Sequence, residues 1–257
     1  MIGVTWLYRQ PKLASARFRA NIPREVLMRR GVVRDGKDVV IASKHNWPVK
    51  EIRQAFPRMI MDVCDDHFGD TRRGHYIEAC NVADQVTCNS EVMRDIIKRE
   101  TGRDATVIDD PYEDDELGPN TTGEGVLWFG HSLNLPDLRS VIEDIRHPLS
   151  VVDSSNYTPE HLDDSLRRCK VVILPTGRSD AKSANRAIKA IRYGKYPVCG
   201  PLTAYRDLGL GEANIGLALD KAMASDNRDK VRALQRLVRY RFSPETVADA
   251  WQRVLCG

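Results

Sequence analysis

Short apolar runs alternate with amphipathic stretches along the first 110 residues of the chain. The runs are typical of buried strands, whereas the stretches between them repeat apolar positions at helical spacing. This pattern predicts strands at 2–7, 38–43, 58–64, 86–89 and 105–108, and helices at 15–31, 76–83 and 90–100, with Ser15 as an N-cap and Pro23 as a kink or restart. An alternation of strands and helices indicates an α/β fold built on a parallel, doubly wound sheet.

An acidic stretch at residues 109–125 contains Pro and Gly and lacks apolar periodicity, which is typical of a linker. We therefore predict a first domain at 1–112, a linker at 113–124 and a second domain at 125–257. In the second domain the alternation restarts, with strands predicted at 126–129, 149–152, 171–174 and 196–199, a helix near 136–145, and a last helix that begins after Ser243 and runs through Val254.

Composition describes an ordinary globular protein, with 42% hydrophobic and 29% charged residues. No apolar run is long enough for a membrane span and the N-terminus lacks a secretory signal, so we expect a cytoplasmic protein. The net charge is +3, and residues 1–110 hold 19 Lys and Arg against 16 Asp and Glu. This excess is too small to indicate nucleic-acid binding by itself.

The six cysteines form no Cys-x-x-Cys pair and lie mostly within apolar runs, which favours reduced, buried thiols. A zinc site can be drawn from one group of residues, but their spacing matches no familiar zinc pattern. These residues are Cys64, His67, His75, Cys80 and Cys88. We expect no metal and no cofactor.

Residues 170–200 carry the strongest functional signal. A strand that ends before Pro175 leads through a polar loop into a helix that Gly194 can terminate. The loop and the helix start are rich in cations and polar side chains, namely Arg178, Lys182, Ser183, Asn185 and Arg186. Because a helix N-terminus attracts anions and ligands bind beyond the carboxyl ends of parallel strands, the pattern predicts a phosphate or diphosphate site.

Other candidates follow the predicted strands, where a parallel sheet carries its functional edge. Arg17 and Arg19 follow the first strand and are acceptor-side or phosphate-side candidates. Asp65, Asp66 and His67 follow the third strand. Bringing two carboxylates and an imidazole together costs free energy unless they are hydrogen-bonded or take part in binding or catalysis. In the second domain the candidates are a polar turn, Gly130, His131 and Ser132, and a weak stacking candidate, Tyr157.

The motif Lys182-Ser-Ala-Asn185-Arg186, followed by Ala190 and Gly194, resembles the donor-site helix of GT-B glycosyltransferases, especially the retaining, family 4-like type that uses nucleotide sugars. The resemblance implies two Rossmann-like domains that face a cleft, with the last helix packed back on the first domain. It also implies that His67 contacts the donor sugar, and that the 130–134 turn and the loop with Tyr157 meet the diphosphate and the base. The sequence departs from the family at Ala181 and Lys189, where acidic residues are usual.

The resulting hypothesis is a metal-independent, retaining transfer of a sugar from a UDP- or GDP-sugar to an acceptor hydroxyl. Asp65 or Asp66 would be the base if the reaction were inverting. The acceptor is either a glycan or a hydroxymethylated base in DNA, as in phage DNA modification. The alternative is a noncatalytic nucleotide-binding or partner-binding module with the same fold, and the oligomeric state stays open.

Overall fold

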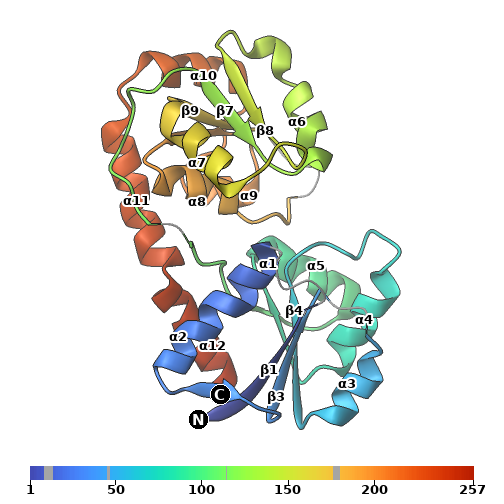
Figure 1. The fold of residues 1–257 in the computed structure, drawn as a ribbon. Coiled ribbons are helices and arrows are strands. Elements are labelled where there is room, and N and C mark those ends of the chain that lie inside the picture. Colours follow the sequence, from blue (N-terminus) through green and yellow to red (C-terminus); the bar gives the residue numbers. More distant parts are fainter. Residues whose placement is uncertain (9–13, 45–46, 114, 176–179) are drawn as a thin grey trace. The chain divides into compact units, whose positions relative to one another are not determined.

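The computed structural model describes residues 1–257 except 9–13, 45–46, 114 and 176–179. The chain divides into two compact units (Figure 1). The first comprises Met1–Glu113 together with Arg241–Gly257, and the second comprises Asp114–Tyr240. The C-terminal segment therefore belongs with the N-terminal unit, although it is distant in sequence.

The first unit is built on a six-stranded sheet with strand order β2-β1-β3-β4-β5-β6, in which all neighbouring strands are parallel. The strands are β1 (Ile2–Tyr8), β2 (Val33–Asp35), β3 (Val39–Ser43), β4 (Arg58–Val63), β5 (Gln85–Cys88) and β6 (Thr106–Val107). The apolar pattern missed β2, because this edge strand is three residues long and buries only its first residue. The prediction of an α/β fold with parallel sheets is confirmed.

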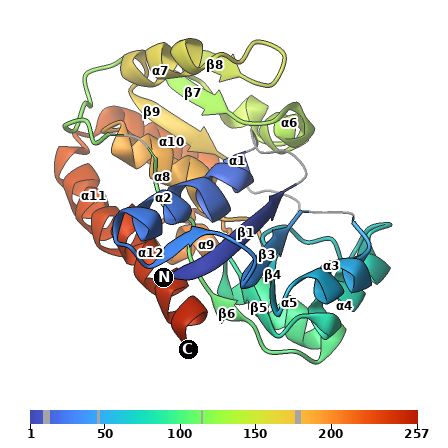
Figure 2. The same cartoon turned by 60° about the horizontal axis from the view of Figure 1, so that its bottom comes forward.

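Helices cover both faces of this sheet (Figures 1 and 2). They are α1 (Ala14–Ala16), a π-helical segment (Arg17–Asn21), α2 (Ile22–Arg29), α3 (Val49–Ala55), α4 (Arg73–Val82), α5 (Glu91–Thr101) and α12 (Pro244–Cys256). Helices α2 and α12 pack side by side, and Trp251 of α12 is fully buried in the same apolar cluster as Val4 and Leu27. The expected cap Ser15 instead lies inside α1. Pro23 stands in the first turn of α2, which continues the π-helical segment without a break, since Asn21 and Ile22 both have helical backbone angles.

The second unit has a four-stranded parallel sheet of order β10-β9-β7-β8. Its strands are β7 (Val126–Phe129), β8 (Leu149–Val152), β9 (Val171–Leu174) and β10 (Tyr196–Cys199). Its helices are α6 (Leu135–Arg139), α7 (Pro159–Arg168), α8 (Asn185–Arg192), α9 (Thr203–Arg206), α10 (Ile215–Ala224) and α11 (Arg228–Phe242, which ends in the first unit), with 3-10 turns at Ser132–Asn134 and Ile142–Asp144. Trp128 of β7 is fully buried against Leu138 of α6 and Leu219 of α10.

The single helix expected near 136–145 is wrong, since α6 ends at Arg139 and a separate 3-10 turn follows. The Ser140 hydroxyl donates to the Asp137 carbonyl at 2.8 Å, a local bond that competes with helix continuation. Two predicted helix boundaries are confirmed. Ser243 caps the start of α12, since its Oγ accepts from Thr246 N at 3.1 Å, and Gly194 ends α8 with a φ of 71°. A Cβ at Gly194 would lie 2.1 Å from the Gly118 carbonyl oxygen, so this position requires glycine.

All six cysteines are free thiols, and five of them are buried. Across the described ranges, every helix is too short or too polar to cross a bilayer.

Candidate functional site

The start of α8 lies next to the carboxyl end of β7 in the second unit. Ala184 is the N-cap residue and offers no side-chain acceptor to the first N–H groups of the helix. These N–H groups and the helix dipole make the terminus favourable for an anion. Asn185 is the first helical residue and Ser183, just before it, is half-buried. Arg178 lies outside the described residues.

Arg186 is held against the end of β7. Its Nη1 donates to the Phe129 carbonyl at 3.3 Å and lies 2.9 Å from the place where a Cβ on Gly130 would be. The ring of Trp128 would lie 3.3 Å from the same Cβ. The guanidinium also faces Tyr205, whose pKa burial raises to about 12 although Arg186 opposes this rise. Glycine at position 130 therefore allows the guanidinium to rest on the strand end.

Lys182 connects the approach to α8 with the turn after β7. Its Nζ donates to Asn134 Oδ1 at 2.7 Å, and Asn134 ends the 3-10 turn that follows Gly130. Two cations from the predicted diphosphate segment thus contact the end of β7 and the turn after it. Together with the N-terminus of α8 they form what we call the α8 anion site.

The remaining donor-side candidates surround this turn. His131 is exposed, and its Nδ1 accepts from Leu133 N at 3.2 Å. Ser154 Oγ donates to Ser132 Oγ at 2.7 Å, which ties the loop after β8 to the loop after β7. Tyr157, in the same loop before α7, is 52% exposed, so part of its ring is available for stacking.

Lys189, which stands where the resembling family has Glu, points along α8 toward α7. Its Nζ lies 3.9 Å from Asp163 Oδ1 and 5.1 Å from the centre of the Tyr193 ring. Tyr193 OH donates to the same carboxylate at 2.5 Å. The lysine therefore joins a local contact between two helices. Ala181, the other departure, is buried.

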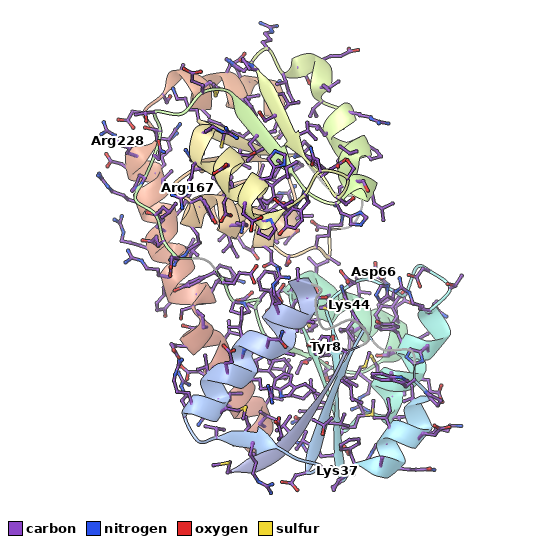
Figure 3. The ribbon with its side chains drawn as sticks, in the orientation of Figure 1. Tyr8, Lys37, Lys44, Asp66, Arg167 and Arg228 are labelled. Atoms are coloured by element: carbon purple, nitrogen blue, oxygen red, sulfur yellow. The ribbon has the colours of Figure 1, made fainter. Side chains whose placement is uncertain are left out.

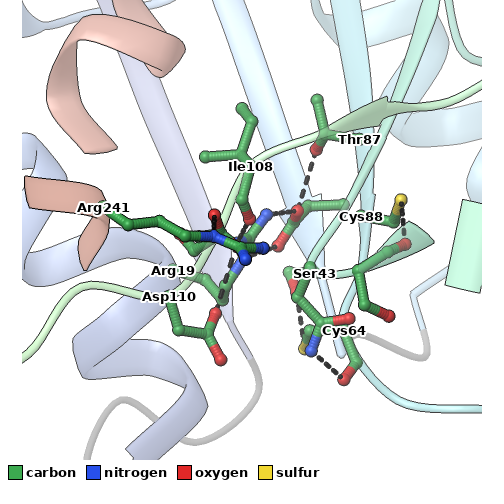
Figure 4. A network of polar contacts seen from close by, with 12 residues as sticks. Arg19, Ser43, Cys64, Thr87, Cys88, Ile108, Asp110 and Arg241 are labelled. Atoms are coloured by element: carbon green, nitrogen blue, oxygen red, sulfur yellow. Dashed lines mark hydrogen bonds and ion pairs between the residues drawn. The ribbon is translucent and has the colours of Figure 1, made fainter. Parts of the chain in front are cut away.

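In the first unit, Arg19 is a buried structural residue, contrary to its expected place on the acceptor or phosphate side. The side chain is fully buried, with Nη2 2.6 Å and Nε 3.1 Å from the two oxygens of Asp62, and Nη1 3.2 Å from Asp110 (Figure 4). Thr87 donates a further bond to Asp62 at 2.8 Å. Burial by itself would lower the pKa of Arg19, and the two carboxylates outweigh it and raise that pKa. A guanidinium with these partners meets no phosphate.

Arg17 differs from Arg19, because its side chain is 40% exposed. Its Nε and Nη2 donate to the two carboxylate oxygens of Glu113 at 2.7 and 2.9 Å. It keeps the surface position expected of a residue that meets a ligand.

Asp65, Asp66 and His67 follow β4 and have three different environments. Asp65 forms an ion pair with Lys44, which follows β3. Asp66 is exposed and accepts from Phe68 N at 3.1 Å. Figure 3 shows Lys44 and Asp66 at the carboxyl edge of the sheet, near Tyr8 at the end of β1.

His67 is 7% exposed, and its Nδ1 lies 3.1 Å from Asp70 Oδ2. Arg72 binds the same carboxylate through Nη2 at 2.6 Å and holds the pKa of Asp70 well below its usual range. Burial and then the charge of Arg72 lower the pKa of His67, although Asp65 and Asp70 oppose this. The imidazole is therefore neutral at pH 7, with Asp70 fixing its orientation.

Sequence reasoning missed the residues that support these candidates. They are Lys44, Asp62, Asp70 and Asp110. A buried, paired role for Asp62 could have been predicted from the sequence, because a carboxylate inside the apolar run Met-Ile-Met-Asp-Val-Cys must have a partner when it is buried. Lys44 had none, because its partner comes from another strand end.

No group of three or more His, Cys, Asp or Glu side chains within the described ranges is placed to hold a metal ion. A pocket of about 240 Å³ lies between β10 and α10 and is lined by Tyr196, Leu217, Lys221 and Lys230, among others. None of its lining residues was predicted as a site residue.

No protein-family model and no curated protein matches the sequence. Solved structures do match. The apo structure of OtsA has a TM-score of 0.62 at 10% identity, over 97% of this chain and 78% of that one. A TarM mutant from S. aureus in complex with fondaparinux, α-GlcNAc-glycerol and UDP has a TM-score of 0.58 at 13% identity, over 85% of this chain and 55% of that one. The GtfA/B complex has a TM-score of 0.53 at 9% identity, over 92% of this chain.

These neighbours are GT-B glycosyltransferases, and this chain has a GT-B glycosyltransferase-like fold. The chain spans 60% of the length of the GtfA/B chain and 55% of the TarM chain.

Proposed function

We propose that this chain transfers a sugar from a nucleotide diphosphate sugar to an acceptor hydroxyl, without a metal ion, and that the α8 anion site binds the diphosphate. The observation that carries the proposal is the meeting of Lys182, Arg186 and the α8 N-terminus at the end of β7. Oriented cations and N–H groups at a strand end are the groups that bind phosphates in α/β folds.

The chemistry follows from this charge arrangement. When the bond between the anomeric carbon and the donor phosphate oxygen breaks, the electron pair leaves with the diphosphate. Negative charge grows there, so Lys182, Arg186 and the helix N–H groups interact more strongly with the transition state than with the bound donor. Arg178 joins this set as a prediction from the sequence alone.

In the first unit, we assign the donor-sugar contact to His67, a neutral imidazole held by Asp70. In the retaining reaction that we favour from the family resemblance, the leaving diphosphate accepts the acceptor proton. In an inverting reaction a carboxylate would take it. Asp66 is then the better candidate, because Asp65 is already paired with Lys44.

The acceptor is a glycan or a hydroxymethylated base in DNA. A noncatalytic nucleotide-binding or partner-binding module remains the second candidate, and the contact of Lys189 with Asp163, where the family uses Glu to bind ribose, favours it. A binder would show nucleotide affinity without turnover.

The test is a panel of UDP- and GDP-sugars crossed with glycan and hydroxymethylated-DNA acceptors, with products read by mass. We expect transfer from one donor, and a loss of about 10²-fold to 10³-fold in kcat when Arg186 or Lys182 is changed to Ala, as for other groups that stabilise a developing anion. Arg139→Ala, at an exposed position on α6, is the matched control with the same charge change. Full activity in Arg186→Ala would refute the assigned site, and nucleotide binding without turnover across the panel would favour the binding module.

A further inference from the structure

Helix α11 concentrates positive charge that the rest of its half of the chain lacks. Residues 111–257 hold 20 basic and 20 acidic residues, which is the total composition less the 19 and 16 of residues 1–110. Within them, α11 carries six Lys and Arg against one acidic residue, Asp229. The helix therefore has a net charge of +5, and the remainder of this half has −5. Such segregation creates a local field toward polyanions although the half is neutral overall.

Three of the six cations of α11 recur along one exposed side of the helix, whereas Arg241 pairs with Asp109 and Lys230 lies over the Tyr196 ring. Arg228, Arg232, Arg236 and Tyr240 recur every fourth residue and are all exposed, and Tyr240 is 82% exposed. Residues four apart on a helix stand about 6 Å apart along its axis and on the same side. We call this row the α11 stripe, and Arg228 at its start is labelled in Figure 3.

Two of the three arginines in the stripe have acidic partners, and both of these partners are exposed. Arg228 pairs with Asp226 and Arg232 with Asp229, and the partner side chains are 52% and 94% exposed. Arg236 has no acidic partner among the residues that the structure describes. Exposed pairs of this kind contribute about 0–1 kcal/mol, so they exchange readily for a stronger anion.

We propose that the α11 stripe binds the phosphate backbone of duplex DNA. Phosphates recur about every 3.4 Å of axis along one strand, so cations about 6 Å apart can meet nearby phosphates of one backbone. A membrane surface fits less well, since the apolar face of the helix is already buried through Val231, Leu234 and Val238. If the chain transfers sugars as proposed above, DNA binding by the stripe favours a hydroxymethylated base in DNA as the acceptor. The DNA binding itself does not depend on sugar transfer.

The test uses the full chain and a fluorescein-labelled 25-base-pair duplex of mixed sequence, with anisotropy measured from about 50 to 200 mM salt, without any sugar donor. Each phosphate contact contributes about −0.9 to the slope of log K against log salt concentration. The double variant Arg232→Ala, Arg236→Ala loses two such contacts, so its slope should be less negative by about 1.8. Its affinity for the duplex should fall roughly 10-fold to 100-fold at 0.1 M salt. The control is Arg94→Ala with Arg99→Ala on α5, a helix with as many acidic as basic residues and the same change in net charge.

An equal loss in both double variants would overturn the proposal, because net charge alone would then explain it. Binding to vesicles containing anionic lipid in place of the duplex would also overturn it. The binding assay contains no sugar donor, so a chain that transfers no sugar can still bind DNA. Conversely, a chain that does not bind DNA can still transfer a sugar to a glycan. The double variant Arg232→Lys, Arg236→Lys keeps both positive charges, so it should keep the wild-type slope. This result would show that the alanine variants lose affinity through lost charge and not through unfolding.

Discussion

Replacing Arg19 by Met tests the assignment of this residue to the core of the first unit. The guanidinium is fully buried and binds both oxygens of Asp62, and it also binds Asp110 and the Ile108 carbonyl (Figure 4). Its removal leaves two buried carboxylates with only part of their partners. Loss of one partner of a buried ion pair costs about 3–5 kcal/mol, against a total stability of about 5–15 kcal/mol for a domain. The variant should therefore lose a large share of the free energy of unfolding of this unit.

The assay is amide hydrogen exchange read by peptide, because it reports the two units separately. Peptides from β4 and α12 should lose protection by the stated free energy in Arg19→Met, whereas peptides from β9 should not change. Arg17→Met is the matched control, because its pair with Glu113 is partly exposed and worth about 0–1 kcal/mol. Equal protection in the two variants, or a defect confined to the KM for an acceptor, would refute the structural role of Arg19.

Three further predictions concern single positions. Gly130→Ala places a methyl group 2.9 Å from Arg186 Nη1, which should displace the guanidinium and weaken UDP or GDP binding by about 1.5–3 kcal/mol, the usual contribution of a hydrogen bond to a charged group. Calorimetry showing wild-type affinity would contradict this. Lys195→Met removes a buried ammonium that donates to the carbonyls of Asn120, Arg167 and Cys169, so unfolding of the second unit should become easier by about 1–3 kcal/mol, and unchanged urea denaturation would argue against it. The pKa of His67 is lowered in the folded state, so the unfolded chain binds the proton more tightly and the free energy of unfolding falls as the pH drops below about 6.5. His67→Gln should reduce this dependence of stability on pH, measured by urea denaturation between pH 5 and 7.5. An unchanged pH dependence would be inconsistent with a neutral buried imidazole.

The parts of the fold that the sequence predicted are those set by local chemistry. The strands β3, β7, β9 and β10 follow apolar runs, and Ser243 and Gly194 mark helix ends through their own side chain and backbone. The sequence placed the segment before α8 and the turn after β7 at the same edge of the sheet, because the carboxyl ends of parallel strands share one edge. The contacts of Lys182 with Asn134 and of Arg186 with the Phe129 carbonyl came only from the structure.

The parts that could not be predicted depend on partners distant in sequence. Arg17 and Arg19 are two residues apart and carry the same side chain, yet the first is partly exposed and the second is fully buried. The difference comes from Asp62 and Asp110, which the fold brings to Arg19 from other strand ends. In the same way, the lysine at position 189 is explained only by its contact with Asp163 on another helix.

The most direct test of the central claim compares UDP and GDP with the corresponding nucleosides, measured by calorimetry on the wild type and on Arg186→Ala. If the α8 anion site binds the diphosphate, the wild type should bind one diphosphate much more tightly than its nucleoside, and Arg186→Ala should lose about 1.5–3 kcal/mol of that difference while nucleoside affinity stays the same, as for a hydrogen bond to a charged group. Equal loss for nucleotide and nucleoside, or no loss for either, would contradict the account.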